Sequence, residues 1–150
     1  MRYLLVDRVT SWDKAGQITG IKNVAMSEDF LEFHFPKNPI MPGIMMLEAL
    51  VQLAGWLEAA SSEFQKWFLL SKVLKSNFYG FVLPGDQLTL KVGVAQGPSQ
   101  DLNVYSGVGE VNGKRKIKAE FQGSLVDLGS IEEAEEQKRF FGILTRSIKF

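Results

Sequence analysis

The chain has no cysteine and a single histidine among its 150 residues. The lack of cysteine excludes disulfides and thiolate nucleophiles, and one imidazole cannot complete a usual zinc site. The 17 basic and 17 acidic residues cancel, so no overall charge favours nucleic acid or an anionic membrane. We therefore expect a protein that binds no metal and no nucleic acid. The absence of cysteine also suits a reducing compartment, so we predict a cytoplasmic location.

Other common signals are also missing. Asp7 and Arg8 end the N-terminal apolar run too early for a signal peptide. Gly107 and Gly109 lack the rest of a phosphate-binding or dinucleotide-binding motif, and no nucleophile elbow occurs. No linker, repeat or low-complexity segment divides the chain. With 45% hydrophobic residues, the sequence predicts one domain over residues 1–150.

A long apolar run extends from Ile40 to Leu57 and contains Pro42, Glu48 and Gln52. A charged residue near the centre of a bilayer costs at least about 2.5 kcal/mol, so we expect no membrane insertion. Pro42 suits the first turn of a helix, where its missing N–H is no loss. The run predicts a helix from about residue 42 to 61, apolar on nearly every side and therefore buried.

The remaining pattern predicts strands followed by a terminal helix. Strands are expected at 16–26, 66–81, 84–96, 101–112 and 114–127, with turns at Pro84-Gly85-Asp86, Gly97-Pro98 and Asn112-Gly113. The segment 29–39 is expected to be irregular, with at most one helical turn. Residues 131–147 predict a helix with glutamates near its start and Arg146 near its end, as the helix dipole favours. We predict an α+β domain whose antiparallel sheet wraps the central helix, with a helical extension (131–150) on the outside of the sheet.

The histidine lies in a setting that suggests chemistry. Phe33 and Phe35 flank His34, and we expect them to desolvate its ring and keep it neutral, as a general base requires. The ordinary alternative is a histidine that is merely bonded to the backbone. The same loop leads directly into the predicted helix.

Three further groups could act together with this imidazole. Glu48 and Gln52 are four residues apart and share a helix face. Glu48 could line a cavity and donate a proton, or could simply reach solvent, and Gln52 could orient its carboxyl or bind water. The N–H of Gly43 lies at the helix start, where it could hold a carbonyl oxygen that acquires charge. A base, an acid and an oxyanion donor suit proton removal beside a carbonyl followed by loss of a hydroxyl, which is a dehydration.

The segment HFPKNPIMPGIMMLEALVQ resembles the active-site motif HFPxxPxMPGxxxxEAxxQ of the β-hydroxyacyl-[acyl-carrier-protein] dehydratases of the FabA/FabZ type. IKNVAMSEDF and FVLPGDQLTLKV resemble that family too, so the match covers roughly residues 18–127. The resemblance implies a hot-dog fold. Glutamate at position 48 favours the FabZ subtype, which dehydrates without isomerising the double bond. Phe33 stands where the family usually has glycine, and the arginine-rich pattern usual near 75–78 is absent.

The resemblance also implies roles and partners. His34 would be the base at C2 of a (3R)-hydroxyacyl thioester, Glu48 the acid for the 3-hydroxyl, and the Gly43 N–H the oxyanion donor, with Gln52, Phe33, Phe35 and Pro42 as further substrate-site residues. The substrate would be carried on the phosphopantetheine arm of acyl carrier protein, with no cofactor or metal. Histidine and acid would come from different subunits, which implies a homodimer or a trimer of dimers.

Two other functions remain open at this point. The same fold could be an acyl thioesterase in which Glu48 activates water, or a non-catalytic acyl-binding subunit in which Phe33 marks divergence. Three basic groups could dock the acidic carrier protein: Lys72 with Lys75, the run from Lys114 to Lys118, and Lys138 with Arg139. The sequence does not choose between them.

Overall fold

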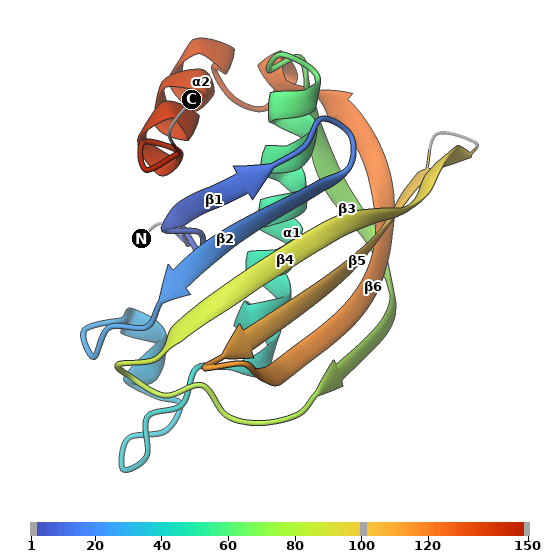
Figure 1. Ribbon diagram of the computed structural model, residues 1–150. Coiled ribbons are helices and arrows are strands. Elements are labelled where there is room, and N and C mark those ends of the chain that lie inside the picture. Colours follow the sequence, from blue (N-terminus) through green and yellow to red (C-terminus); the bar gives the residue numbers. More distant parts are fainter. Residues whose placement is uncertain (1–2, 100–101, 149–150) are drawn as a thin grey trace.

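In residues 3–99 and 102–148, which the computed structural model describes, six strands form an antiparallel sheet that curls around a long helix, α1 (Gly43–Ser61) (Figure 1). The sheet order is β1-β2-β4-β5-β6-β3. The strands are β1 (Arg8–Trp12), β2 (Gln17–Asn23), β3 (Lys66–Phe78), β4 (Gln87–Ser99), β5 (Leu102–Val111) and β6 (Lys114–Asp127). A second helix, α2 (Ala134–Leu144), follows the last strand.

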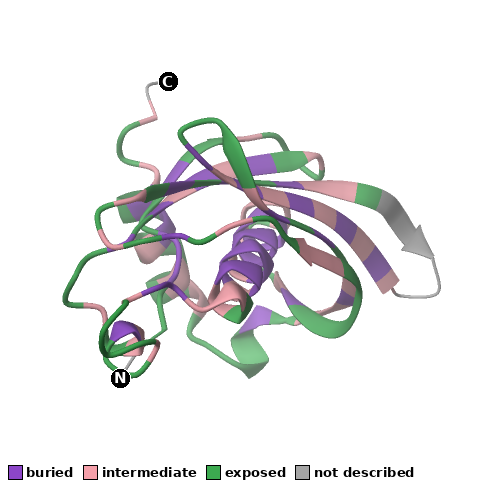
Figure 2. Ribbon diagram, turned by 90° about the horizontal axis from the view of Figure 1, so that it is seen from below, coloured by how far each residue is buried: buried purple, intermediate pink, exposed green. Residues whose placement is uncertain are grey.

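Helix α1 lies in the hollow of the curled sheet, where Figure 2 shows it mostly buried. Its Leu50, Leu53 and Leu57 are completely buried. By length and composition alone α1 could cross a membrane, but 67% of its apolar window is buried inside the fold. A helix that is apolar on every side needs material around it, and here the sheet supplies it. The predicted core helix is therefore confirmed.

The strands follow from alternation and turn chemistry. In β4 the side chains of Leu88, Leu90 and Val92 are fully buried while their neighbours face outward, as a period of two requires. Asn112 and Gly113 both have positive φ, 50° and 79°, which a two-residue turn between β5 and β6 needs. The predicted bounds of β6 agree with the structure.

Three details of the strand prediction were wrong. Strand β1 was not anticipated, because Val9 is its one buried residue and the segment carries no alternation. Strand β4 continues through Gly97 and Pro98, so the turn predicted there is absent. Residues 100 and 101 lie outside the described part of the chain. Strand β3 ends at Phe78 rather than at residue 81.

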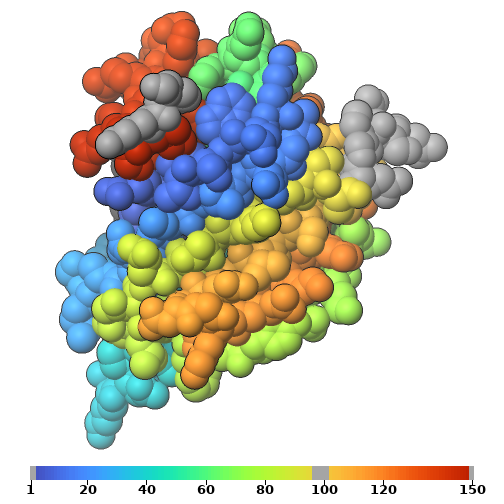
Figure 3. Space-filling model, viewed as in Figure 1, coloured from blue at the N-terminus to red at the C-terminus, as the bar shows by residue number. Residues whose placement is uncertain are grey.

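The position of α2 also differs from the prediction. Phe141 packs against Trp12, Trp56 and Phe64, with ring centroids 5.7–6.0 Å apart, so α2 covers the C-terminal end of α1 rather than the outside of the sheet. Figure 3 shows α2, in red, against the blue N-terminal strands. Glu135 and Glu136 do lie in its first turn, whereas Arg146 lies beyond its last residue.

Candidate functional site

His34 is held by a pair of hydrogen bonds to one residue. Its Nδ1 lies 2.8 Å from the carbonyl oxygen of Ile40, and the Ile40 N–H donates to the His34 carbonyl at 2.8 Å. A carbonyl oxygen only accepts, so a neutral His34 carries its proton on Nδ1. That tautomer leaves the lone pair of Nε2 free to accept a proton.

The two flanking phenylalanines behave differently. Phe35 stacks on the His34 ring, with centroids 4.3 Å apart and planes 24° apart. Phe33 is 79% exposed and contributes to neither of the cavities described below. The expectation that Phe33 desolvates the imidazole is therefore wrong within one chain. A loop sequence does not determine which side chains turn inward.

His34 lines a cavity of about 230 Å³ at the N-terminal end of α1, which we call the histidine cavity. Gly43 and Phe78 also line it, together with Phe35, Ile40, Met41, Met46, Gly80 and Phe81. A Cβ on Gly43 would lie 2.9 Å from Cδ1 of Phe78, so the ring of Phe78 occupies the space that the glycine leaves. Phe78 was not predicted, because no local pattern in the sequence brings the end of β3 beside the start of α1.

The start of α1 leaves a donor available. Pro42 is the N-cap of α1, and its carbonyl accepts the N–H of Met45 at 2.9 Å. Among the described residues no hydrogen-bond partner is found for the Gly43 N–H. The first N–H groups of a helix lack intrahelical partners and face an electrostatically positive end. Gly43 can therefore donate to an oxygen in the histidine cavity, whereas Pro42 does not line it.

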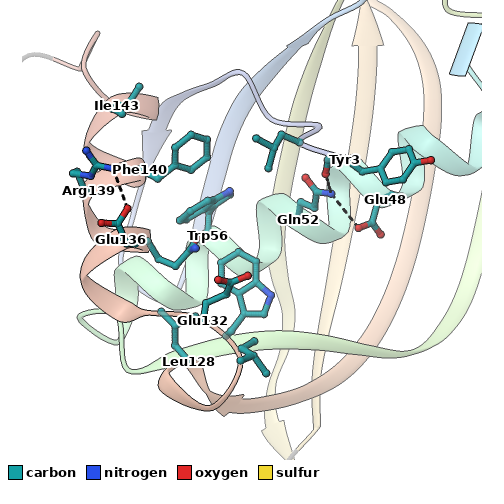
Figure 4. A pocket seen from close by; sticks show the side chains of 14 residues that line it. Tyr3, Glu48, Gln52, Trp56, Leu128, Glu132, Glu136, Arg139, Phe140 and Ile143 are labelled. Carbon is teal, nitrogen blue, oxygen red and sulfur yellow. Dashed lines mark hydrogen bonds and ion pairs between the residues drawn. The ribbon is translucent and has the colours of Figure 1, made fainter. Parts of the chain in front are cut away.

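Glu48 lines a second, larger space of about 610 Å³, the carboxylate cavity (Figure 4). Gln52 Nε2 donates to Glu48 Oε1 at 3.1 Å and to the Tyr3 carbonyl at 2.8 Å, while its Oε1 accepts the Leu5 N–H at 2.9 Å. The amide of Gln52 is thus engaged on both sides. It orients the Glu48 carboxyl and ties it to the N-terminal segment.

The structure brings the predicted residues together in two groups. His34, Phe35 and Gly43 line the histidine cavity, and Glu48 and Gln52 line the carboxylate cavity. The two cavities share no lining residue. In one chain, the predicted base and acid therefore face different spaces.

A buried polar network that links α1 to β5 was not predicted. The Tyr105 hydroxyl donates to Glu58 Oε1 at 2.6 Å and accepts from Asn103 Nδ2 at 3.0 Å. Burial, followed by the bond to Glu58, raises the pKa of Tyr105 far above its ordinary value. A glutamate within an apolar helix was the available signal. The network lines neither cavity, so it belongs to the core.

Within residues 3–99 and 102–148, no three histidine, aspartate or glutamate side chains gather as metal ligands would. His34 is the one imidazole of the histidine cavity, and Glu48 lines the carboxylate cavity from α1, apart from Glu132 and Glu136 on the α2 side. Their arrangement suits proton transfer by individual side chains.

Comparison with known proteins identifies relatives of this chain. A family model described as "FabA-like domain" matches residues 1–120. The 3-hydroxyacyl-[acyl-carrier-protein] dehydratase FabZ of Histophilus somni (strain 2336) is 39% identical over 119 residues, which is 78% of each chain. The enzyme of the same name from Geobacter metallireducens is 36% identical over 128 residues, covering 83% of this chain and 85% of the relative.

Solved structures share the fold at lower identity. The crystal structure of smu.793 from Streptococcus mutans UA159 bound to acetyl CoA has a TM-score of 0.62 and 14% identity, covering 80% of this chain and 88% of that one. The dehydratase heterocomplex ApeI:P from Xenorhabdus doucetiae has a TM-score of 0.58 and 16% identity, covering 73% and 88%. The expected hot-dog fold is confirmed.

Proposed function

Because the chain belongs to the family of FabA-like domains, we propose that it is a 3-hydroxyacyl-[acyl-carrier-protein] dehydratase, a hydro-lyase of fatty acid or related lipid biosynthesis. The observation that carries the proposal is that His34 lines a cavity while Ile40 engages its Nδ1, which leaves Nε2 to act as the base. Its product would be a trans-2-enoyl thioester. Elimination beside a thioester carbonyl needs no cofactor, since the carbonyl itself acidifies the proton on C2.

The reaction assigns one task to each group. Nε2 of His34 removes the proton from C2, and the electron pair of that C–H bond forms the C2–C3 double bond. The Gly43 N–H holds the charge that develops on the thioester oxygen. The carboxyl proton of Glu48 passes to the 3-hydroxyl as the C3–O bond breaks, and water leaves. Gln52 is a positioning residue, since it acts through the Glu48 carboxyl.

A homodimer with shared sites would reunite the two cavities. Strand β3 is the last strand of the sheet order, and its Leu69, Leu70, Val73 and Leu74 are exposed. A long apolar edge strand invites pairing with a second copy. Trp67, near the start of β3, lines the carboxylate cavity, and Phe78, at its end, lines the histidine cavity. Antiparallel two-fold pairing of β3 would set one copy's histidine cavity against the other's carboxylate cavity.

The carrier protein and the location of the enzyme follow from the same proposal. We assign acyl carrier protein as the partner that presents the substrate, with docking near the histidine cavity. The run from Lys114 to Lys118 suits this role, because the carbonyl of Lys116 accepts the N–H of Tyr79 at 2.9 Å, next to Phe78 and Gly80 of that cavity. A cytoplasmic location is part of the proposal, since fatty acid synthesis supplies the carrier thioesters there.

The decisive experiment measures enoyl formation by absorbance from a series of 3-hydroxyacyl carrier thioesters. We expect His34→Ala and Glu48→Gln each to lower kcat by about 10²–10⁴-fold, the usual contribution of a general acid or base. Glu120→Gln, the same change at an exposed position of β6, is the matched control and should retain wild-type rates. Release of free thiol in place of the enoyl product would instead indicate hydrolysis and overturn the proposal.

Shared sites can be tested separately by mixing the two inactive variants. In a mixed dimer of His34→Ala and Glu48→Gln, one site carries both substitutions and the other carries neither. Random exchange of subunits should restore about one quarter of wild-type activity. A mixture that stays inactive, although exchange is verified with a mass tag, would show that each chain acts alone.

A further inference from the structure

The C-terminal helix forms one wall of the carboxylate cavity. Glu136, Arg139, Phe140 and Ile143 of α2 line this cavity opposite Glu48 and Gln52 of α1 (Figure 4). The match to the family model ends at residue 120, whereas α2 begins at Ala134. This wall therefore lies outside the region that the family model matches, and it borders the cavity that the proposed acid lines.

From this placement we infer that α2 limits the length of the acyl chain that the enzyme accepts. The inference rests on the proposed function. In the shared site proposed above, the thioester carbonyl and C2 would lie at Gly43 and His34 in the histidine cavity of one copy, and C3 would lie at Glu48 in the carboxylate cavity of the other. The carbons beyond C3 must then continue past Glu48, into the carboxylate cavity.

The cavity has a defined far end along α1. Glu48, Gln52 and Trp56 lie at successive turns of one helix face and all line it. At ~1.5 Å of rise per residue, Trp56 lies about 12 Å beyond Glu48. The ring of Trp56 packs against Trp67 and Phe140, with centroids 5.2 and 5.7 Å apart. Trp67 reaches this place because Gly55 has no side chain; a Cβ there would collide with its ring.

Charged groups border the end of the cavity on the α2 side. Glu136 pairs with Arg139 at 2.9 Å, and Glu132 lies just before the start of α2. An alkyl tail that passed Trp56 would have to strip water from these groups without giving them partners, which is costly. The wall therefore favours tails that end before Phe140 and disfavours long saturated chains.

The test compares two neighbouring phenylalanines. Phe140 lines the cavity, whereas Phe141 is buried on the other side of α2 against Trp12 and Phe64 and does not line it. We expect Phe140→Ala to raise kcat/KM for 3-hydroxyhexadecanoyl relative to 3-hydroxyoctanoyl carrier thioester by about tenfold, as a few methylenes in an apolar pocket would. Phe141→Leu, which keeps an apolar side chain against Trp12 and Phe64, should leave that ratio unchanged. If Phe140→Ala does not fold, Ile143→Ala, at a half-exposed position of the same wall, is expected to shift the ratio in the same direction.

A binding measurement separates this inference from the proposed function. Saturated acyl-pantetheines of the same two lengths are titrated against the full chain, with the fluorescence of the cavity tryptophans as the signal. A wild-type protein that turns over no 3-hydroxyacyl thioester would defeat the proposed function, while the binding profile would still decide the role of α2. A folded Phe140→Ala variant that keeps the wild-type length preference in binding and turnover, or an equal shift in Phe141→Leu, would overturn the inference.

Discussion

Both ends of α1 are rich in aromatic residues, but the rings are buried at one end and exposed to solvent at the other. At the C-terminal end, Trp56 and Phe141 are buried among the other rings of the α2 contact. At the N-terminal end, Phe35 and Phe78 are each at least half exposed beside His34. Large apolar side chains left in water usually mark an interaction surface.

The difference indicates where this chain depends on another molecule. At the closed end the large rings pack against one another within the chain, since α2 supplies Phe140 and Phe141. The open end carries the proposed base and an exposed aromatic rim, and it stays unfinished in one copy. The following changes test whether the closed end supports folding and the open end supports assembly and catalysis.

The largest effect on stability is expected at the closed end. Trp56→Ala removes a nearly buried indole that touches Trp67, Phe140 and Phe141, so it should lower the free energy of unfolding by about 3–5 kcal/mol. Phe78→Ala, at the open end, should cost less than about 1 kcal/mol at low protein concentration. Urea unfolding of both variants gives the two values. Equal losses of stability would show that the closed end is no more important for folding than the open end.

The loop that leads to the open end has its own anchor. Lys22 is 3% exposed, and its Nζ lies 2.6 Å from Glu28 and 3.6 Å from Asp7. Lys22→Ala leaves these two carboxylates without their cation. Because both carboxylates are partly exposed, we expect the free energy of unfolding to fall by about 2–3 kcal/mol, less than the full cost of a broken buried pair.

The surface ion pair between Lys66 and Asp127 provides the matched control for Lys22. Their charged atoms are 2.7 Å apart, and both side chains are exposed. Lys66→Ala should therefore change thermal stability little, because solvent screens an exposed pair. If the two lysine variants unfolded at the same temperature, Lys22 would not anchor the loop.

The sequence predicts those parts of the molecule that local signals specify. Asn112-Gly113 specifies a hairpin because both residues accept positive φ, and the apolar run after Pro42 specifies a buried helix. The motif likewise places His34 and Gly43 at one cavity. These features depend on residues close together in the chain.

The rest depends on contacts between distant segments. Phe78 joins His34 because β3 runs back along α1, a path that no local pattern encodes. The amphipathic α2 indicates that one face is buried, but not that Trp12 and Trp56 bury it. Separation of Glu48 from His34 into two cavities is also a property of the assembled fold.

A smaller loss of stability is expected from a change in the polar network that links α1 to β5. Tyr105→Phe removes the hydroxyl that donates to Glu58 and leaves a buried carboxyl without that partner. We expect the free energy of unfolding to fall by about 1–2 kcal/mol. Tyr79→Phe, at a half-exposed position, is the control and should have the same free energy of unfolding as the wild type. A Tyr105→Phe protein as stable as the control would mean that Glu58 finds another donor.

The smallest effect is a dependence on alkaline pH. Burial raises the pKa of Tyr105 in the folded chain, so the folded state keeps its phenol protonated after the unfolded state has begun to lose that proton near pH ~10. The contribution of Tyr105 is thus fully present below that pH and declines as pH rises, by up to about 1.4 kcal/mol per unit. Tyr3 and Tyr79, both about half exposed, are present in both proteins, so the difference between wild type and Tyr105→Phe isolates the buried residue. Urea unfolding should show wild type more stable than Tyr105→Phe at neutral pH, and this difference should shrink near pH ~11. The reason is that alkali removes from the wild type the stabilisation that the substitution has already removed. A difference that stays the same at both pH values would contradict the prediction.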